Sequence, residues 1–259
     1  MNNIKKILIP VDLSESSEKT LNYVKGLVKN SPDAQVILLY VCSTSVSDQE
    51  IESKKLQLTA LVKIWSDKLP YCTFQLKTGD LINTILQVQQ ESNVDLIIMG
   101  TGGEQDKKTE TVTSRLVLEA DCPVLVIPIS LEKFSLKSIA LALGENTIDN
   151  SGGLEALHDI ARTFDATVHV LSVNRNGGDP VIKAENQEVL DYYLESLLYF
   201  HAFPKNSDIE LGISEYIQKH QIDMLAILPR NHARSTKPSD GRLTKLLTLR
   251  TKVPLLTID

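Results

Sequence analysis

The second half of the chain repeats the apolar pattern of the first half, and this internal repeat constrains the fold more than any other feature. Residues 6–12 (KILIPVD) and 35–41 (QVILLYV) are short apolar runs with the length of buried strands. Their counterparts in the second half are residues 138–143 (SIALAL) and 167–173 (TVHVLSV). Self-similarity of this kind is typical of a structural unit that occurs more than once. The chain is therefore predicted to fold as two copies of one unit.

The correspondence continues to the ends of both halves. Residues 94–99 (VDLIIM) match residues 222–227 (IDMLAI), and residues 122–127 (CPVLVI) match residues 253–258 (VPLLTI). The spacing between matching residues changes slightly along the chain. These changes place the length differences between the copies in loops and in the second helix, where insertions are tolerated.

Amphipathic segments separate the apolar runs. Residues 14–30 carry apolar side chains at helical spacing, and either Ser14 or Ser16 can cap the start of this helix. Near-continuous Val, Ile and Leu strands that alternate with such helices imply parallel sheets covered on both faces. The other helices are predicted over residues 50–69, 82–92, 115–120, 186–200 and 209–220.

The predicted fold class is α/β, with two tandem open parallel five-stranded sheets and helices on both faces of each sheet. The first domain is expected over residues 1–130 and the second over residues 137–259. Residues 129–136 form a linker whose polar part is expected to be exposed. Because this linker is short, we expect the two domains to pack together.

Composition excludes several classes of protein. The 27 basic and 33 acidic residues give a net charge of -6, with no basic excess to drive nucleic-acid binding. No apolar run approaches the roughly 20 residues of a membrane span, and residues 7–11 are too few for a secretory leader. Cys42, Cys72 and Cys122 are far apart, which is typical of reduced cytosolic thiols. We therefore expect a cytoplasmic protein with neither nucleic acid nor membrane as a partner.

Polar and apolar residues at the ends of the first two strands are candidates for a binding site. In an open parallel sheet, ligands bind beyond the carboxyl ends of the strands, where the strand order reverses. Asp12 follows Pro10 and Val11 there, and its carboxylate either accepts hydrogen bonds from a ribose or base, or caps the next helix. Val41 ends the second strand and either packs on a flat base or belongs to the strand core.

A glycine-rich loop follows the fourth strand, in the stretch MGTGGEQDKKTETVTSR at residues 99–115. Its glycines permit unusual backbone angles and a close approach of the backbone to a ligand. Thr113 and Ser114 precede the last helix, and backbone N–H groups with a hydroxyl at a helix start bind anions. The loop is therefore either a phosphate cradle or an ordinary loop that ends in a serine cap.

Three motifs resemble the universal stress protein family, here in a tandem two-domain form that covers nearly the whole chain. They are ILIPVDLSES at residues 7–16, DLIIMGT at residues 95–101 and CPVLVIP at residues 122–128. The resemblance implies a Rossmann-like, adenine nucleotide α-hydrolase-like fold. ATP-binding members carry Gly, two residues, Gly, nine residues, then Gly and Ser or Thr.

The resemblance implies an ATP or AMP site in the first domain only. Gly100 and Gly103 have the motif's first spacing and Ser114 fits its end, whereas Thr113 stands where the family has glycine. A β-carbon at Thr113 obstructs the approach of the backbone to phosphates and disfavours positive φ. The implied contacts are to adenine or ribose from Asp12, beside Pro10 and Val11, to the base from Val41, to adenosine from Met99 and Gly100, and to phosphate from Gly103, Thr113 and Ser114.

The second copy lacks these residues. Gly144 stands in the place of Asp12, PRNH at residues 229–232 replaces GTGG, and Lys245 aligns with Ser114. We therefore expect no nucleotide in that half. Family members pair through their last strands, so the resemblance implies an intramolecular pseudo-dimer of residues 124–126 with 255–257, and a further protein partner not named by the sequence.

Enzymatic functions have little support in the sequence. All five histidines lie in the second copy, without Cys or His at ligand spacing. Ser151-Gly152-Gly153 lacks the Asp-Ser that a pyrophosphatase loop requires, and the acidic cluster of a phosphoacceptor receiver domain is absent. Two functions remain. One is a non-enzymatic stress-response regulator that binds an adenine nucleotide, and the other is a nucleotide-free scaffold that acts through protein contacts.

Overall fold

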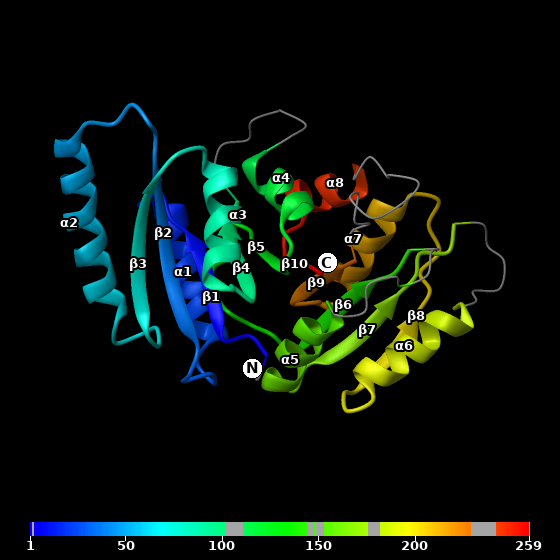
Figure 1. Cartoon of the computed structure of the whole chain (residues 1–259). Coiled ribbons are helices and arrows are strands. Elements are labelled where there is room, and N and C mark those ends of the chain that lie inside the picture. The colour runs from blue at the N-terminus through cyan, green and yellow to red at the C-terminus, as the bar shows by residue number, and fades with distance from the viewer. Residues whose placement is uncertain are drawn as a thin grey trace. The chain divides into compact units, whose positions relative to one another are not determined.

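Parallel strands form the centre of each half of the chain (Figure 1). The computed structural model describes residues 1, 3–101, 111–144, 148, 153–175, 182–228 and 242–258. The chain divides into an N-terminal unit, Asn2–Phe134, and a C-terminal unit, Ser135–Asp259. In the described part of the chain, no helix combines the length and apolar character that a membrane span requires.

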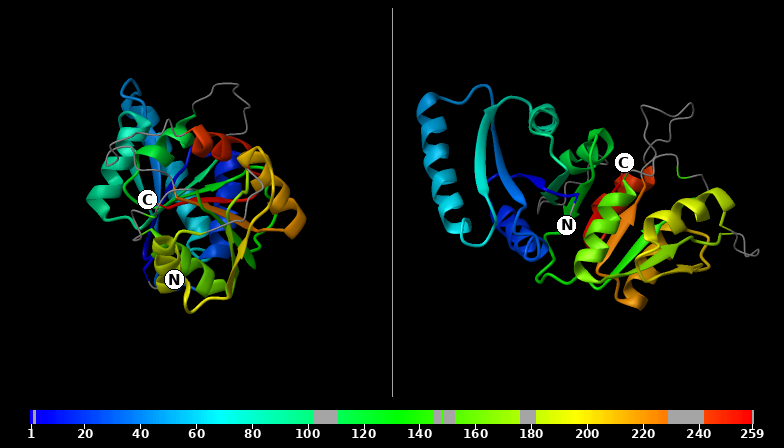
Figure 2. Two further views of the ribbon diagram at one scale, coloured as in Figure 1. Left: turned by 90° about the vertical axis from the view of Figure 1, so that its right-hand side faces the viewer. Right: turned by 60° about the horizontal axis from the view of Figure 1, so that its bottom comes forward.

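The N-terminal unit has the strand order β3-β2-β1-β4-β5. Right-handed crossovers between parallel strands place α1 and α2 on one face of this order and α3 and α4 on the other. Helices flank the strands in all views (Figures 1 and 2). The elements are β1 (Lys6–Pro10), α1 (Glu15–Leu27), β2 (Gln35–Cys42), α2 (Asp48–Trp65), β3 (Cys72–Thr78), α3 (Leu81–Ser92), β4 (Leu96–Gly100), α4 (Val112–Glu119) and β5 (Val124–Ile127).

The C-terminal unit repeats this order as β8-β7-β6-β9-β10. The predicted α/β class with two parallel five-stranded arrangements is confirmed. The elements are β6 (Ser138–Ala142), α5 (Leu154–Phe164), β7 (Thr167–Leu171), α6 (Ala184–Leu194), β8 (Tyr199–Ala202), α7 (Ile209–His220), β9 (Met224–Ile227), α8 (Arg242–Arg250) and β10 (Leu255–Thr257).

A repeated aspartate holds the first strand of each unit against its fourth strand. Asp95 Oδ2 accepts hydrogen bonds from the backbone N–H groups of Lys5 and Lys6, at 2.9 and 2.8 Å. Asp223 Oδ2 does the same for Lys137 and Ser138, at 2.7 and 3.1 Å.

β1 lies between β2 and β4, so the strand order of the N-terminal unit reverses at β1. This reversal opens a crevice at the carboxyl ends of β1 and β4.

The helix before that aspartate is delimited in the same way in both units. Asp80 caps α3 by accepting from Asn83 N–H at 3.0 Å, and Asp208 caps α7 by accepting from Leu211 N–H at 2.9 Å. Asn93 and Gln221 end these helices with positive φ angles of 49° and 51°. The repeat therefore preserves backbone hydrogen bonds as well as apolar cores.

One predicted helix is wrong in its second half. Residues 186–200 were expected to be one helix, but α6 ends at Leu194 and β8 begins at Tyr199. Residues 197–200 (LLYF) are apolar without interruption, and such a short run has no periodicity that separates helix from strand. Pairing of β8 with β7 decides for the strand, with His169 opposite Phe200.

The segment after β5 is anchored on α1 by an aromatic contact. The rings of Tyr23 and Phe134 lie 5.0 Å apart at 60°, an edge-to-face arrangement. A β-carbon at Gly26 would lie 2.3 Å from Cγ of Phe134. Gly26 therefore leaves the space in which the Phe134 ring packs against α1.

Replacement of Gly26 by alanine tests this contact through the sign of its effect. In an exposed helix, Gly→Ala usually stabilises by about 1 kcal/mol. We expect Gly26→Ala to destabilise the chain by about 1–3 kcal/mol in urea unfolding, because the new methyl group overlaps Phe134. In a Phe134→Ala background the same substitution should cost less or stabilise. A stabilising effect of Gly26→Ala alone would contradict the packing.

His169 is a buried polar residue of the C-terminal core. Its Nδ1 lies 2.9 Å from Oη of Tyr216, and its ring packs 4.4 Å from Phe200. Burial lowers the pKa of His169 below the usual 6.5, and the nearby His220 lowers it further. The folded protein therefore favours the neutral imidazole.

This shift predicts acid sensitivity of the C-terminal unit. Below pH 6.5 the unfolded chain protonates this histidine before the folded chain does, so stability falls as the pH drops. We expect the melting temperature to decline between pH 7 and 5, and His169→Gln to flatten the decline. His220→Gln should flatten it less, because burial is the larger cause. Equal slopes for wild type and His169→Gln would refute the assignment.

Candidate functional site

The candidate site lies at the carboxyl ends of β1, β2 and β4. Pro10 pairs with Leu39 in the register of β1 and β2, and Val11 N–H donates to Leu39 O at 2.9 Å. Asp12 lies two residues after Pro10, and Val41 lies two residues after Leu39. The predicted contacts to base and ribose therefore lie at the same edge of the sheet. Pro10 and Val41 are half-buried and Val11 is buried.

Asp12 supports the start of α1 without being its cap. Its Oδ1 accepts from Ser14 N–H at 3.0 Å, from Ser14 Oγ–H at 2.5 Å and from Ser17 Oγ–H at 2.6 Å. Ser14 is the N-cap and accepts from Ser17 N–H. Leu13, between Asp12 and Ser14, has a φ of 64°. Of the two candidate caps, Ser14 is therefore the one used, and the turn presents the exposed Asp12 at the crevice.

The hydrogen bonds to Asp12 keep its carboxyl group ionised. Burial raises its pKa, but the bonds from Ser14 and Ser17 outweigh burial and hold the pKa below its usual 3.8. Within the described residues, all hydrogen bonds that it accepts go to Oδ1. Oδ2 can therefore accept from a hydroxyl or amine of a ligand at neutral pH.

Gly100 allows α1 to approach β4 closely. A β-carbon at this position would lie 2.4 Å from Oγ1 of Thr20 and 3.1 Å from Oγ of Ser16. The φ angle of Gly100 does not lie in the left-handed region. Among the glycines of the described residues, Gly79 is the one with a positive φ. Gly100 is thus required for close packing and not for a turn, which brings the start of α1 beside the end of β4.

Thr101 connects three segments at this edge, although the sequence patterns did not indicate it as a site residue. Its backbone oxygen accepts from Ser16 Oγ–H at 3.1 Å, and its Oγ1 accepts from Ile129 N–H at 3.1 Å. Thr101 therefore joins α1, β4 and the segment after β5. Its place at the end of the DLIIMGT motif was the one signal in the sequence.

The last helix of the N-terminal unit begins earlier than predicted. Residues 115–120 were expected to be helical after Thr113 and Ser114, but α4 starts at Val112 and is capped by Thr111. Thr111 Oγ1 accepts from Ser114 N–H at 3.1 Å, and Ser114 Oγ accepts from Thr111 N–H at 2.9 Å. Thr113 and Ser114 are 6% and 0% exposed, on the same face as Leu116 and Val117.

The hydroxyl at the start of α4 is therefore that of Thr111. Ser114 Oγ–H also donates to Thr111 O at 3.0 Å, so its hydroxyl is engaged within the helix. Gly103, the remaining predicted phosphate contact, lies outside the described residues. Met99 is half-buried at the end of β4.

The corresponding edge of the C-terminal unit is built differently. A β-carbon at Gly144, in the place of Asp12, would have no other atom within 4 Å. Val173, in the place of Val41, packs so closely on α7 that a β-carbon at Gly212 would lie 2.9 Å from its Cγ1. Residues 229–232 lie outside the described residues. Lys245 lies within α8 and not at its first residue.

Metal ligands and reactive thiols do not gather in the described part of the chain. No group of three or more His, Cys, Asp or Glu side chains there has the arrangement of a metal site. Cys42 and Cys122 are buried, Cys72 is half-buried, and all three are free thiols. Burial raises the pKa of Cys122 to about 12, which keeps it protonated and unreactive.

Comparison with known proteins identifies relatives of the N-terminal unit. The family described as the universal stress protein family matches residues 3–128. Universal stress protein Sll1654 of Synechocystis sp. is 31% identical over an alignment of 135 residues, and the match covers 48% of this chain and 85% of that protein. Universal stress protein MJ0577 of Methanocaldococcus jannaschii is 30% identical over an alignment of 153 residues, and the match covers 48% of this chain and 94% of that protein.

A solved structure extends the similarity over both units. The crystal structure of a universal stress protein from Archaeoglobus fulgidus has a TM-score of 0.73 to this chain, at 15% identity. The match covers 98% of this chain and 96% of the other. At this level of identity the likeness establishes a shared fold.

The position of the α4 cap can be tested by substitution. We expect Thr111→Val to destabilise the chain by about 1 kcal/mol, because it removes the side-chain acceptor of Ser114 N–H. Thr111→Ser keeps that acceptor and should stay within a few tenths of a kcal/mol of wild type. Thermal unfolding followed by circular dichroism measures both. If the helix began only at residue 115, Thr111→Val would have no effect.

Proposed function

This chain belongs to the universal stress protein family, and from that premise we propose that its N-terminal unit binds an adenine nucleotide as a regulatory ligand. The bound nucleotide would set the conformation or partner choice of a stress-response protein. The C-terminal unit would have a structural role, because Gly144 replaces the acidic residue of the site. The free thiols fit action in the cytoplasm.

The ionised carboxylate of Asp12 at the strand reversal is the observation that carries this proposal. It is oriented by Ser14 and Ser17, and Oδ2 can accept a hydrogen bond from a ribose hydroxyl or an adenine amine. Gly100 brings the start of α1 to the same edge, so helix N–H groups lie near the crevice. Val41 and Met99, both half-buried, supply apolar surface for a base.

The start of α4 favours a monophosphate over a triphosphate. Ser114 N–H donates to Thr111, and Ser114 itself is inaccessible to a ligand, so α4 has fewer donors for additional phosphates. We therefore propose that AMP binds at least as tightly as ATP.

We propose that binding is not followed by catalysis. The N-terminal unit contains no histidine, and Asp12, the acid of the site among the described residues, accepts hydrogen bonds from Ser14 and Ser17. Without a general base placed beside a phosphate, hydrolysis of ATP would be slow.

A nucleotide-free scaffold is the second candidate function. Two observations favour it, the capping of α4 by Thr111 and the burial of Ser114. Both leave fewer groups at the start of α4 for a phosphate. In that case the two units would act through protein contacts, and the predicted pairing of their last strands would provide the framework.

Calorimetric titration of the purified full chain with AMP and with ATP separates these functions. We expect AMP to bind and Asp12→Asn to weaken it about tenfold or more, because the substitution removes a charged acceptor. Asparagine keeps an acceptor for Ser14 and Ser17, so the turn should persist. Asp33→Asn, an exposed acid of the same unit, is the matched control and should bind normally.

Two outcomes would decide against parts of the proposal. Absence of binding at millimolar AMP and ATP, together with no nucleotide released on denaturing the native protein, would support the scaffold. ATP binding much tighter than AMP would contradict the assignment of the α4 start as a poor triphosphate site.

A further inference from the structure

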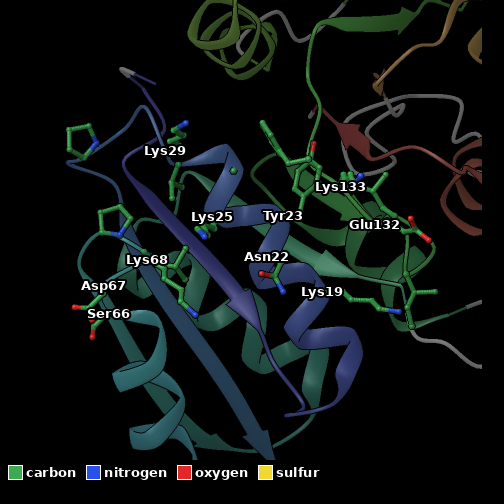
Figure 3. A pocket seen from close by; sticks show the side chains of 18 of the residues that line it. Lys19, Asn22, Tyr23, Lys25, Lys29, Ser66, Asp67, Lys68, Glu132 and Lys133 are labelled. Carbon is green, nitrogen blue, oxygen red and sulfur yellow. The ribbon is translucent and has the colours of Figure 1, made fainter.

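A groove runs along the solvent side of α1, away from Asp12. Three segments line it: α1 with the turn that follows, residues 66–70 between α2 and β3, and residues 129–134 after β5. Asp12, Val41 and Met99 are not among its lining residues. In Figure 3, Asn22, Tyr23 and Lys25 of α1 lie between the turn with Ser66, Asp67 and Lys68 and the segment with Glu132 and Lys133. We call it the lysine groove.

The charge of the lysine groove is opposite to that of the chain. Its lining contains Lys19, Lys25, Lys29, Lys68 and Lys133, against the acids Asp67 and Glu132. The chain as a whole carries a net charge of -6. A positive depression on a negative protein concentrates anionic partners locally and steers them to this one face.

Most of these lysines have no acidic partner among the described residues of the N-terminal unit. Lys19 pairs with Glu15 at 3.1 Å, and Lys68 Nζ lies 4.8 Å from the centre of the Trp65 ring. No ion pair joins Lys25, Lys29 or Lys133 to another described residue. Their ammonium groups are exposed and can pair with carboxylates of a bound partner.

The groove is large and one of its walls is held in place. The open groove has a volume of about 1400 Å³, more than the roughly 300–1,000 Å³ of a small-molecule pocket. Phe134 packs on Tyr23 and over Gly26, which anchors the segment after β5 along α1. An extended chain segment therefore fits better than a single small anion.

From this geometry we propose that the lysine groove binds an extended acidic peptide segment of a protein partner. Carboxylates of the segment pair with Lys25, Lys29 and Lys68, while its backbone lies over α1. Nucleic acid is a poorer match, because Tyr23 is 4% exposed and offers no stacking surface for bases, and the half-buried ring of Phe134 packs against it. Asp67 and Glu132 also interrupt the track that a phosphate backbone would need.

The test uses the full chain and a fluorescent ten-residue glutamate peptide, followed by anisotropy. We expect saturable binding that weakens as ionic strength rises. The double variant Lys25→Glu/Lys29→Glu should weaken it about tenfold or more. The matched control is Lys55→Glu/Lys63→Glu, which makes the same charge change on exposed positions of α2 outside the groove.

Further arms separate the partner classes and the two proposed sites. A ten-nucleotide thymidine strand should bind more weakly than the peptide, and tighter binding of the strand would overturn the proposal. Equal loss in the control variant would also overturn it, because binding would then follow net charge alone. AMP titration of Lys25→Glu/Lys29→Glu should match wild type, so the groove can fail while the nucleotide site stands.

Discussion

The pairing of β1 with β4 is the constraint on which the rest of the N-terminal unit depends. Strand order reverses there, and only such a reversal leaves a crevice at the carboxyl ends of parallel strands. Asp95 holds the two strands together at one end by accepting the N–H groups that precede and open β1. Gly100 lets α1 close over the other end. Both the Asp12 turn and the position of α1 follow from these two contacts.

Helix α1 contributes side chains to two different surfaces of the N-terminal unit. Its first turn, with Ser14 and Ser17, orients the carboxylate of Asp12 at the crevice. Its later turns place Lys25 on the solvent side, where the segment ending at Phe134 builds the wall of a second, cationic surface. A ligand at one surface and a partner at the other would thus contact the same helix.

The two copies differ in ligand residues and agree in backbone contacts. Asp95 and Asp223 each satisfy two N–H groups at the start of a strand, and Asp80 and Asp208 each cap a helix. Those donors exist in any copy of the fold and are costly to leave unpaired, whatever the unit binds. A ligand contact carries no such requirement, and Gly144 has replaced the acid in the second copy.

The sequence by itself determined the repeat, the parallel α/β class and the placement of Asp12 at a strand end, because these depend on apolar periodicity and chain order. Tertiary structure decided what periodicity leaves open. Residues 109–114 offer three threonines and a serine as caps, and packing of Leu116 and Val117 on the sheet sets the helix phase that makes Thr111 the cap and buries Ser114. The run LLYF at residues 197–200 fits helix or strand equally, and pairing with β7 selects the strand. The close approach at Gly100 and the groove on α1 join segments distant in sequence, so no local pattern could reveal them.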